Sequence, residues 1–131
     1  MIRHGEPPYL ECSSRGDYRF SAFHACLPNR NFCTIEEIYQ SSKRFEPGPG
    51  IDMFGHVTDW RKAKGKRAIN QIEVAELYEL LWREYLKKNP WLMQILTEAS
   101  GLSDVFGQTG HVCQATTLWS LRNEYLLLGC I

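Results

Sequence analysis

Residues 34–45 read Thr34-Ile35-Glu36-Glu37-Ile38-Tyr39-Gln40-Ser41-Ser42-Lys43-Arg44-Phe45, and the helix that this stretch predicts organises the rest of the chain. Thr34 is a favourable N-cap residue, and Glu37, three positions later, completes a capping box. A mostly apolar stripe at helical spacing is typical of a face that packs on a core. That stripe consists of Ile35, Ile38, Tyr39, Ser42 and Phe45.

A second stripe of the same helix is polar. Glu36, Gln40 and Lys43 are four and three residues apart, so their side chains line up beside the buried face. A carboxylate, an amide and an ammonium in one row suit a substrate that carries both a developing positive charge and a phosphate. A solvated surface is the other interpretation, because exposed helix faces consist mostly of charged and amide residues.

The bulk composition indicates one globular domain. A chain of 131 residues with 44% hydrophobic and 23% charged residues can bury a sizeable core. The net charge is zero, with 15 acidic and 15 basic residues, so the general positive field of most nucleic-acid-binding proteins is absent. No apolar run approaches the roughly 20 residues of a membrane span, so we expect no membrane partner.

Cysteine usage favours a reducing compartment. The five cysteines are scattered and form no C-x-x-C pair, which argues against a zinc site and against a disulfide framework. The first residues lack the apolar segment of a signal peptide, so we expect a cytoplasmic protein. A phage- or virus-encoded protein that acts in a host cytoplasm fits the same observations.

The N-terminal half predicts a small sheet. Residues 9–13 favour a short strand, and residues 18–26, with aromatic residues on both faces, favour a second strand that is buried on both sides. Glycines and prolines at 46–50 end the first helix and begin a loop over residues 46–58. Such a loop serves as a binding loop in some domains and as a plain surface connection in others.

The C-terminal half predicts further helices. Asn70 and Glu73 form a second capping box at the start of a helix over 70–88, and Asn89-Pro90 favours the start of another that closes near Gly101. Residues 101–111 are dense in glycine and predict a loop. A last helix over 112–125 and a short strand over 126–128 complete an α+β domain, with a small sheet from the N-terminal half and four to five helices around it.

The strongest charge feature is a basic segment in the middle of the chain. Five of the seven residues from Arg61 to Arg67 are basic, and Trp60 adjoins them. Tryptophan can stack on a base while neighbouring cations bind phosphate. The alternative is a solvated basic loop.

Three carboxylates remain as candidates for chemistry after the structural roles are assigned: Glu36, Asp59 and Asp104. No G-x-S-x-G element, P-loop or H-E-x-x-H motif occurs, and the spacing of His24 and Cys26 does not indicate a nucleophile–base pair.

Six short motifs follow one another along residues 18–125. They are Phe20-Ser21-Ala22-Phe23, Glu36 with Gln40 and Lys43, Asp59-Trp60, Lys88-Asn89-Pro90 with Leu92, Asp104-Val105-Phe106-Gly107, and Arg122. In their order and spacing the chain resembles the NADAR family. The resemblance implies a single NADAR-like domain over residues 1–131.

The chain departs from the family pattern at three places. Glu37 stands where the family usually has histidine, Phe106 replaces a tryptophan that usually comes one residue later, and Gln114 stands near a position where asparagine is favoured.

The resemblance implies an N-glycosidase that hydrolyses a ribose C1–N bond in a phosphorylated or ADP-ribosylated nucleoside-type substrate. Cleavage of such a bond develops oxocarbenium charge, which a carboxylate stabilises while a second carboxylate activates water. We expect Glu36 to face the cation and Asp104 the water, although the sequence leaves the reverse assignment open. No metal or redox cofactor is needed.

The resemblance also implies the residues that bind the substrate. Lys43 would bind phosphate as a point charge, Trp60 would stack on the base, and Arg61 or Lys62 would neutralise phosphate. The further expected substrate contacts are Phe23, Gln40, Phe106 and Gln114.

Two other functions remain open at this point. The same pocket could retain an ADP-ribose-derived nucleotide without turnover, in which case loss of Glu36 would change affinity only modestly. Residues 60–67 could instead bind DNA or RNA, including modified nucleic acid, and steep salt dependence would then be expected.

Overall fold

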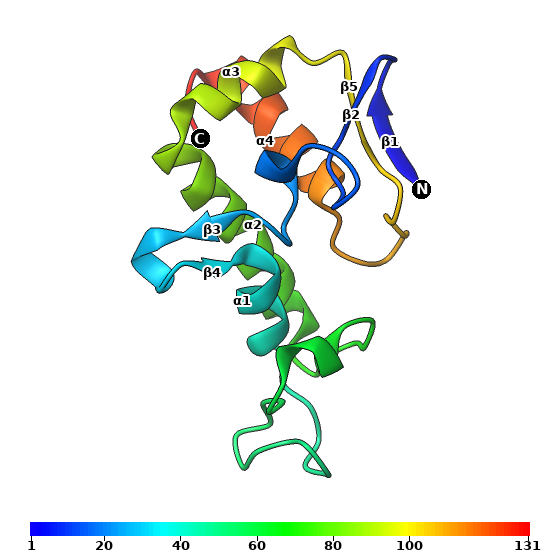
Figure 1. Cartoon of the computed structure of the whole chain (residues 1–131), viewed down its shortest axis with the longest axis vertical. Coiled ribbons are helices and arrows are strands. Elements are labelled where there is room, and N and C mark those ends of the chain that lie inside the picture. The colour runs from blue at the N-terminus through cyan, green and yellow to red at the C-terminus, as the bar shows by residue number, and fades with distance from the viewer.

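Four α-helices and two small β-sheets make up the chain in the computed structural model, which describes residues 1–131 (Figure 1). The predicted α+β class is therefore confirmed. No helix is both long enough and apolar enough to cross a membrane.

The larger sheet has the strand order β1-β5-β2, with β5 in the centre. β1 (Ile2–Gly5) is antiparallel to β5 (Gly101–Asp104), and β2 (Tyr9–Glu11) is parallel to it. The predicted loop over 101–111 is thus wrong for its first four residues. All four are buried, and a Cβ at Gly101 would lie 2.5 Å from the Glu6 carbonyl oxygen, so glycine here permits close strand packing rather than a loop.

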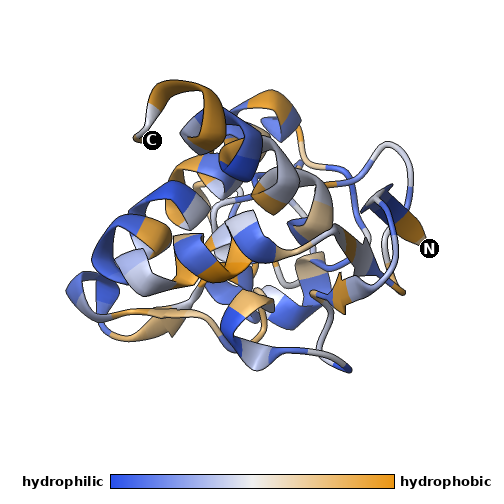
Figure 2. Ribbon diagram, turned by 90° about the horizontal axis from the view of Figure 1, so that it is seen from above, coloured by the Kyte–Doolittle hydropathy of each residue, from blue (hydrophilic) through white to orange (hydrophobic).

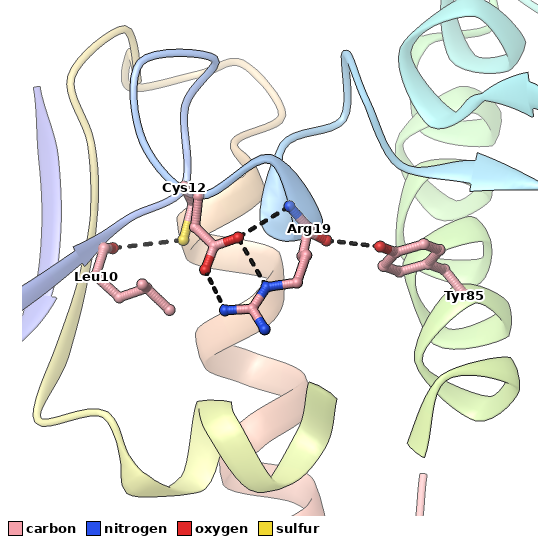
Figure 3. A network of polar contacts seen from close by, with 5 residues as sticks. Leu10, Cys12, Arg19 and Tyr85 are labelled. Carbon is pink, nitrogen blue, oxygen red and sulfur yellow. Dashed lines mark hydrogen bonds and ion pairs between the residues drawn. The ribbon is translucent and has the colours of Figure 1, made fainter. Parts of the chain in front are cut away.

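The predicted strand over 18–26 is also wrong for most of its length. Residues 18–20 form a 3₁₀ turn, η1 (Tyr18–Phe20), because the Asp17 side chain accepts a hydrogen bond from the Arg19 N–H at 3.0 Å. Tyr85 from the long helix then donates from its hydroxyl to the Arg19 carbonyl at 2.8 Å (Figure 3). This bond fastens the turn to the helical layer.

A two-stranded ribbon leads into the first helix. β3 (Cys26–Leu27) pairs antiparallel with β4 (Cys33–Thr34), and a second 3₁₀ turn, η2 (Pro28–Arg30), joins them. Helix α1 (Ile35–Ser41) begins as predicted, because Thr34 Oγ1 accepts from the Glu37 N–H at 3.1 Å. The helix ends at Ser41, earlier than Phe45.

Helix α2 (Gln71–Lys88) is the central helix of the core. Its start does not use the predicted capping box. Asn70 instead accepts from the Arg44 N–H at 2.8 Å and donates to the Ser42 carbonyl at 3.0 Å, so its side chain joins the end of α1 to the start of α2.

Two shorter helices contact α2, and the second of them also contacts β1 and β5 of the larger sheet. They are α3 (Pro90–Glu98) and α4 (Gln114–Leu128), and the Asn89 side chain bonds back to the Tyr85 carbonyl instead of capping α3. The predicted strand over 126–128 is wrong, because α4 continues to Leu128 and closes at Gly129 with a φ of 77°. Leu126, Leu127 and Leu128 are exposed. The ribbon near the C-terminus is accordingly hydrophobic in Figure 2.

The core contains 21 buried apolar residues, and Trp82, Phe20 and Leu81 are among the largest fully buried side chains. Residues 46–58 lie outside this core and extend away from the sheet (Figure 1). A third 3₁₀ turn, η3 (Trp60–Ala63), leads the chain back to α1.

Candidate functional site

One cavity of about 450 Å³ lies between α1, α2, the segment after η3 and the chain from β5 to α4. Seven of the ten residues expected from the sequence line it: Phe23, Glu36, Gln40, Lys43, Asp104, Phe106 and Gln114. They come from four separate parts of the chain, so folding is what brings the two candidate carboxylates to one cavity.

Glu36 is a buried carboxylate with one oxygen available. It lies in the first turn of α1, where Oε1 accepts from Gln40 Nε2 at 2.8 Å and Oε2 makes no hydrogen bond within the protein. Burial raises the pKa of Glu36 above its ordinary value, and the Gln40 bond and the charges of Lys64 and Lys43 oppose that rise. Such a group is suited to proton transfer.

Asp104 is held at both oxygens. It ends β5, where Oδ1 accepts from the Phe106 N–H at 3.0 Å and Oδ2 accepts from Gln114 Nε2 at 2.9 Å. The Cys113 thiol also donates to Oδ2, at 3.5 Å, and burial raises the pKa of that thiol. Asp104 is therefore fixed in orientation as an acceptor.

The backbone of Ala22 connects the two carboxylates. Its carbonyl accepts from the Glu36 N–H at 3.0 Å, and its N–H donates to Gln114 Oε1 at 2.8 Å. Because Gln114 Oε1 accepts the hydrogen bond from Ala22, the Nε2 group at the other end of the amide faces Asp104. The motif Phe20-Ser21-Ala22-Phe23 contributes to the family resemblance. The role of the Ala22 backbone N–H and carbonyl could not be derived from residue type.

Lys43 has a structural contact that the sequence did not reveal. Its Nζ donates to the carbonyls of Ala63 at 3.2 Å and Lys66 at 2.7 Å, and it lies 5.1 Å from the centre of the Tyr39 ring. Burial lowers the pKa of Lys43, although the charge of Glu36 opposes this effect. The ammonium thus fastens the end of η3 and the segment after it to the chain just beyond α1.

Aromatic rings form much of the cavity wall. Tyr39 and Tyr78 meet edge to face with centroids 5.2 Å apart, and both line the cavity together with Phe23 and Phe106. Burial raises the pKa of both tyrosines, so their hydroxyls stay protonated at physiological pH. Helical spacing predicts that Tyr39 and Tyr78 lie on apolar faces that pack on the core. This pattern gives no indication that both side chains also line the cavity.

Three expected substrate contacts do not line the cavity. Trp60, Arg61 and Lys62 belong to η3, where the Arg61 guanidinium lies 4.8 Å from the Trp60 ring and pairs with Asp59 at 3.3 Å. The neighbouring residues Lys64 and Gly65 line it instead. Composition shows that the segment over 61–67 is basic, but it does not indicate which of these residues face the cavity.

Arg122 also lies away from the cavity. Its guanidinium donates to the carbonyls of Leu96 at 2.9 Å and Ala99 at 3.2 Å at the end of α3, and it stacks over Trp119 at 4.3 Å. It therefore caps a helix C-terminus. The other lining residues that the sequence did not single out for the pocket are Ser14, Gly107, Gln108, His111 and Val112.

Comparison with known proteins found no matching family model and no significantly similar curated protein. No group of three or more histidine, cysteine, aspartate or glutamate side chains is arranged to hold a metal ion.

Proposed function

We propose that the protein is an N-glycosidase that hydrolyses a ribose C1–N bond in a phosphorylated or ADP-ribosylated nucleoside-type substrate. The observation that carries the proposal is the pairing of Glu36 and Asp104 in one aromatic-lined cavity of about 450 Å³. A cavity of this size accepts a nucleotide-sized ligand, and its rings can stack on a base.

The hydrogen bonds support a division of labour between the carboxylates that reverses the expectation from the sequence. Asp104, held in orientation by the Phe106 N–H and by Gln114, stabilises the oxocarbenium charge. Glu36 has a free oxygen and a raised pKa, and it moves the proton.

The reaction then balances with water alone. The C1–N bond breaks and its electron pair leaves with the base, while the water oxygen bonds to C1. Glu36 accepts a proton from the water and passes one proton to the leaving nitrogen, so the carboxylate is regenerated in each turnover. Burial of Glu36 at 7% exposure strengthens its effect on the reacting atoms.

A turnover assay tests the proposal. Purified protein is incubated with ADP-ribosylated guanine DNA, with ribosylated pyrimidine phosphates and with ADP-ribose nucleotides, and the free sugar phosphate or ADP-ribose is followed by mass spectrometry. Glu36→Gln should lower kcat by about 10²- to 10⁴-fold. Glu37→Gln is the matched control, because Glu37 lies on the same helix and does not line the cavity.

Each other outcome assigns a different function. Retention of a nucleotide without release of product, with only a small effect of Glu36→Gln on affinity, identifies a binding protein. Binding of unmodified DNA or RNA that weakens steeply with salt and requires residues 60–67 identifies a nucleic-acid-binding protein. Equal loss of turnover in Glu36→Gln and Glu37→Gln contradicts the assigned chemistry.

A further inference from the structure

Three aromatic residues of the cavity wall each have a cation over the ring. The pairs are Lys43 over Tyr39 at 5.1 Å, Lys64 over Phe23 at 4.6 Å and Arg15 over Phe106 at 5.1 Å. Cations at such distances are attracted to the ring faces, which holds the flexible side chains near the cavity.

The three cations differ in what else they bind. Lys43 is 4% exposed and is already bound to two backbone carbonyls. Lys64 and Arg15 are exposed, and neither forms an ion pair or a side-chain hydrogen bond with the protein. Both can therefore bind an external anion without breaking an ion pair or a side-chain hydrogen bond.

The surroundings of the two cations favour an anion at the edge of the cavity. Lys64 itself lines the cavity beside Gly65, and Ser14, the neighbour of Arg15, lines it as well. By contrast, five arginines of the chain form ion pairs with carboxylates: Arg19, Arg30, Arg44, Arg61 and Arg83. Lys64 and Arg15 are thus available positive charges next to ring faces that can hold an aromatic ligand.

We propose that Lys64 and Arg15 form a phosphate clamp that selects an aromatic ligand with two anionic groups, of the nucleoside diphosphate class. One cation lies over Phe23 and the other over Phe106, and both rings belong to the cavity wall. The proposal rests on the proposed function because it names the substrate class of the same site. It also assigns phosphate recognition to Lys64 and Arg15. The expectation from the sequence assigned this role to Lys43, Arg61 and Lys62.

Calorimetric titration with ADP, AMP and adenosine tests the clamp without any turnover. The wild-type protein should bind ADP more tightly than AMP, and AMP more tightly than adenosine. Lys64→Gln and Arg15→Gln should each weaken ADP binding by roughly tenfold, because each removes a charge-assisted contact to phosphate. Adenosine binding should not change, and it also reports that the variants are folded.

Two double variants complete the design. Lys87→Gln with Lys88→Gln removes two exposed lysines of α2 that lie away from this cavity, and ADP affinity should stay at the wild-type value. Arg61→Gln with Lys62→Gln tests the sequence-based assignment directly. The salt dependence of ADP binding should fall in Lys64→Gln and Arg15→Gln only, since surface charge contacts are screened by salt.

The outcomes separate the clamp from the glycosidase. Equal affinity for ADP and adenosine, no ADP binding at millimolar concentration, or a loss that occurs in Arg61→Gln with Lys62→Gln and not in Lys64→Gln overturns the clamp, whatever the turnover assay gives. ADP selectivity that depends on Lys64 and Arg15 supports the clamp even if no substrate is hydrolysed.

Discussion

The side-chain oxygen of Gln114 accepts a hydrogen bond of 2.8 Å from the backbone N–H of Ala22, and this bond determines which end of the amide faces the cavity. The Nε2 group is left to donate to Asp104 at 2.9 Å. A residue at the start of α4 thereby fixes a carboxylate at the end of β5.

Gln114→Glu should destabilise the protein by about 2 kcal/mol at neutral pH, because it replaces the donor to Asp104 with a second negative charge while keeping an acceptor for Ala22. Urea unfolding at neutral pH measures the change, and the loss should shrink in acid as one carboxyl becomes protonated. Gln108→Glu is the control, since Gln108 lines the cavity but makes no such bond. Equal losses in both variants would contradict the assigned role of Gln114.

Glu36→Gln should raise stability at neutral pH. Burial raises the folded-state pKa of Glu36 above the ordinary 4.5, so its contribution to stability is fully present below pH 4.5 and is lost as the pH rises through the folded value. The neutral amide avoids that loss. Thermal unfolding should therefore show a higher Tm for Glu36→Gln at neutral pH and equal Tm values below pH 4.5, and a lower Tm at neutral pH would oppose the burial argument.

Glu11→Gln should change the pH dependence of stability in the direction opposite to that expected for Glu36→Gln. Burial alone would raise the pKa of Glu11, but hydrogen bonds from Ser13, Val105 and Ser103 outweigh it and lower the pKa below 4.5. The resulting stabilisation is present above pH 4.5 and is lost as the pH falls through the folded value. The variant should be less stable by about 1–2 kcal/mol at neutral pH, and the gap should close in acid. A gap that persists in acid would point to packing instead of charge.

Lys43→Met should cost about 2–3 kcal/mol, because the carbonyls of Ala63 and Lys66 lose their buried donor while the apolar stem is kept. Urea unfolding measures the loss, and proteolysis after η3 should accelerate. ADP affinity should fall far less than in Lys64→Gln. Lys62→Met removes an exposed lysine of η3 and should change none of these three quantities.

Local signals in the sequence were sufficient to predict that the four helices exist, but not where α1 and α4 end. Thr34 marks the start of α1 because its cap bond spans only three residues, and the apolar stripe of α2 depends only on helical spacing. β5 was missed because its residues Gly101 and Ser103 are small, and their burial depends on strands from the other end of the chain.

The same distinction applies to the site. Glu36 and Gln40 follow helical spacing on α1, whereas Lys43 lies two residues beyond the end of the helix, and all three side chains line the cavity. The partners of these side chains could not be derived, because Lys43 meets carbonyls some 20 residues away and Asp104 meets an amide at the start of another helix. Residue types predict which groups carry charge, and only the fold determines what each charge faces.

The Arg44 carbonyl accepts a hydrogen bond from the Ile69 N–H, and the Arg44 N–H donates to the Asn70 side chain. These two bonds join the start of residues 45–68 to their end. A cut near Gly50, where the surroundings are open, would leave Glu36 on one fragment and Asp104 on the other. The cavity is therefore formed jointly by the chain before Gly50 and the chain after it, and neither part alone contains both carboxylates.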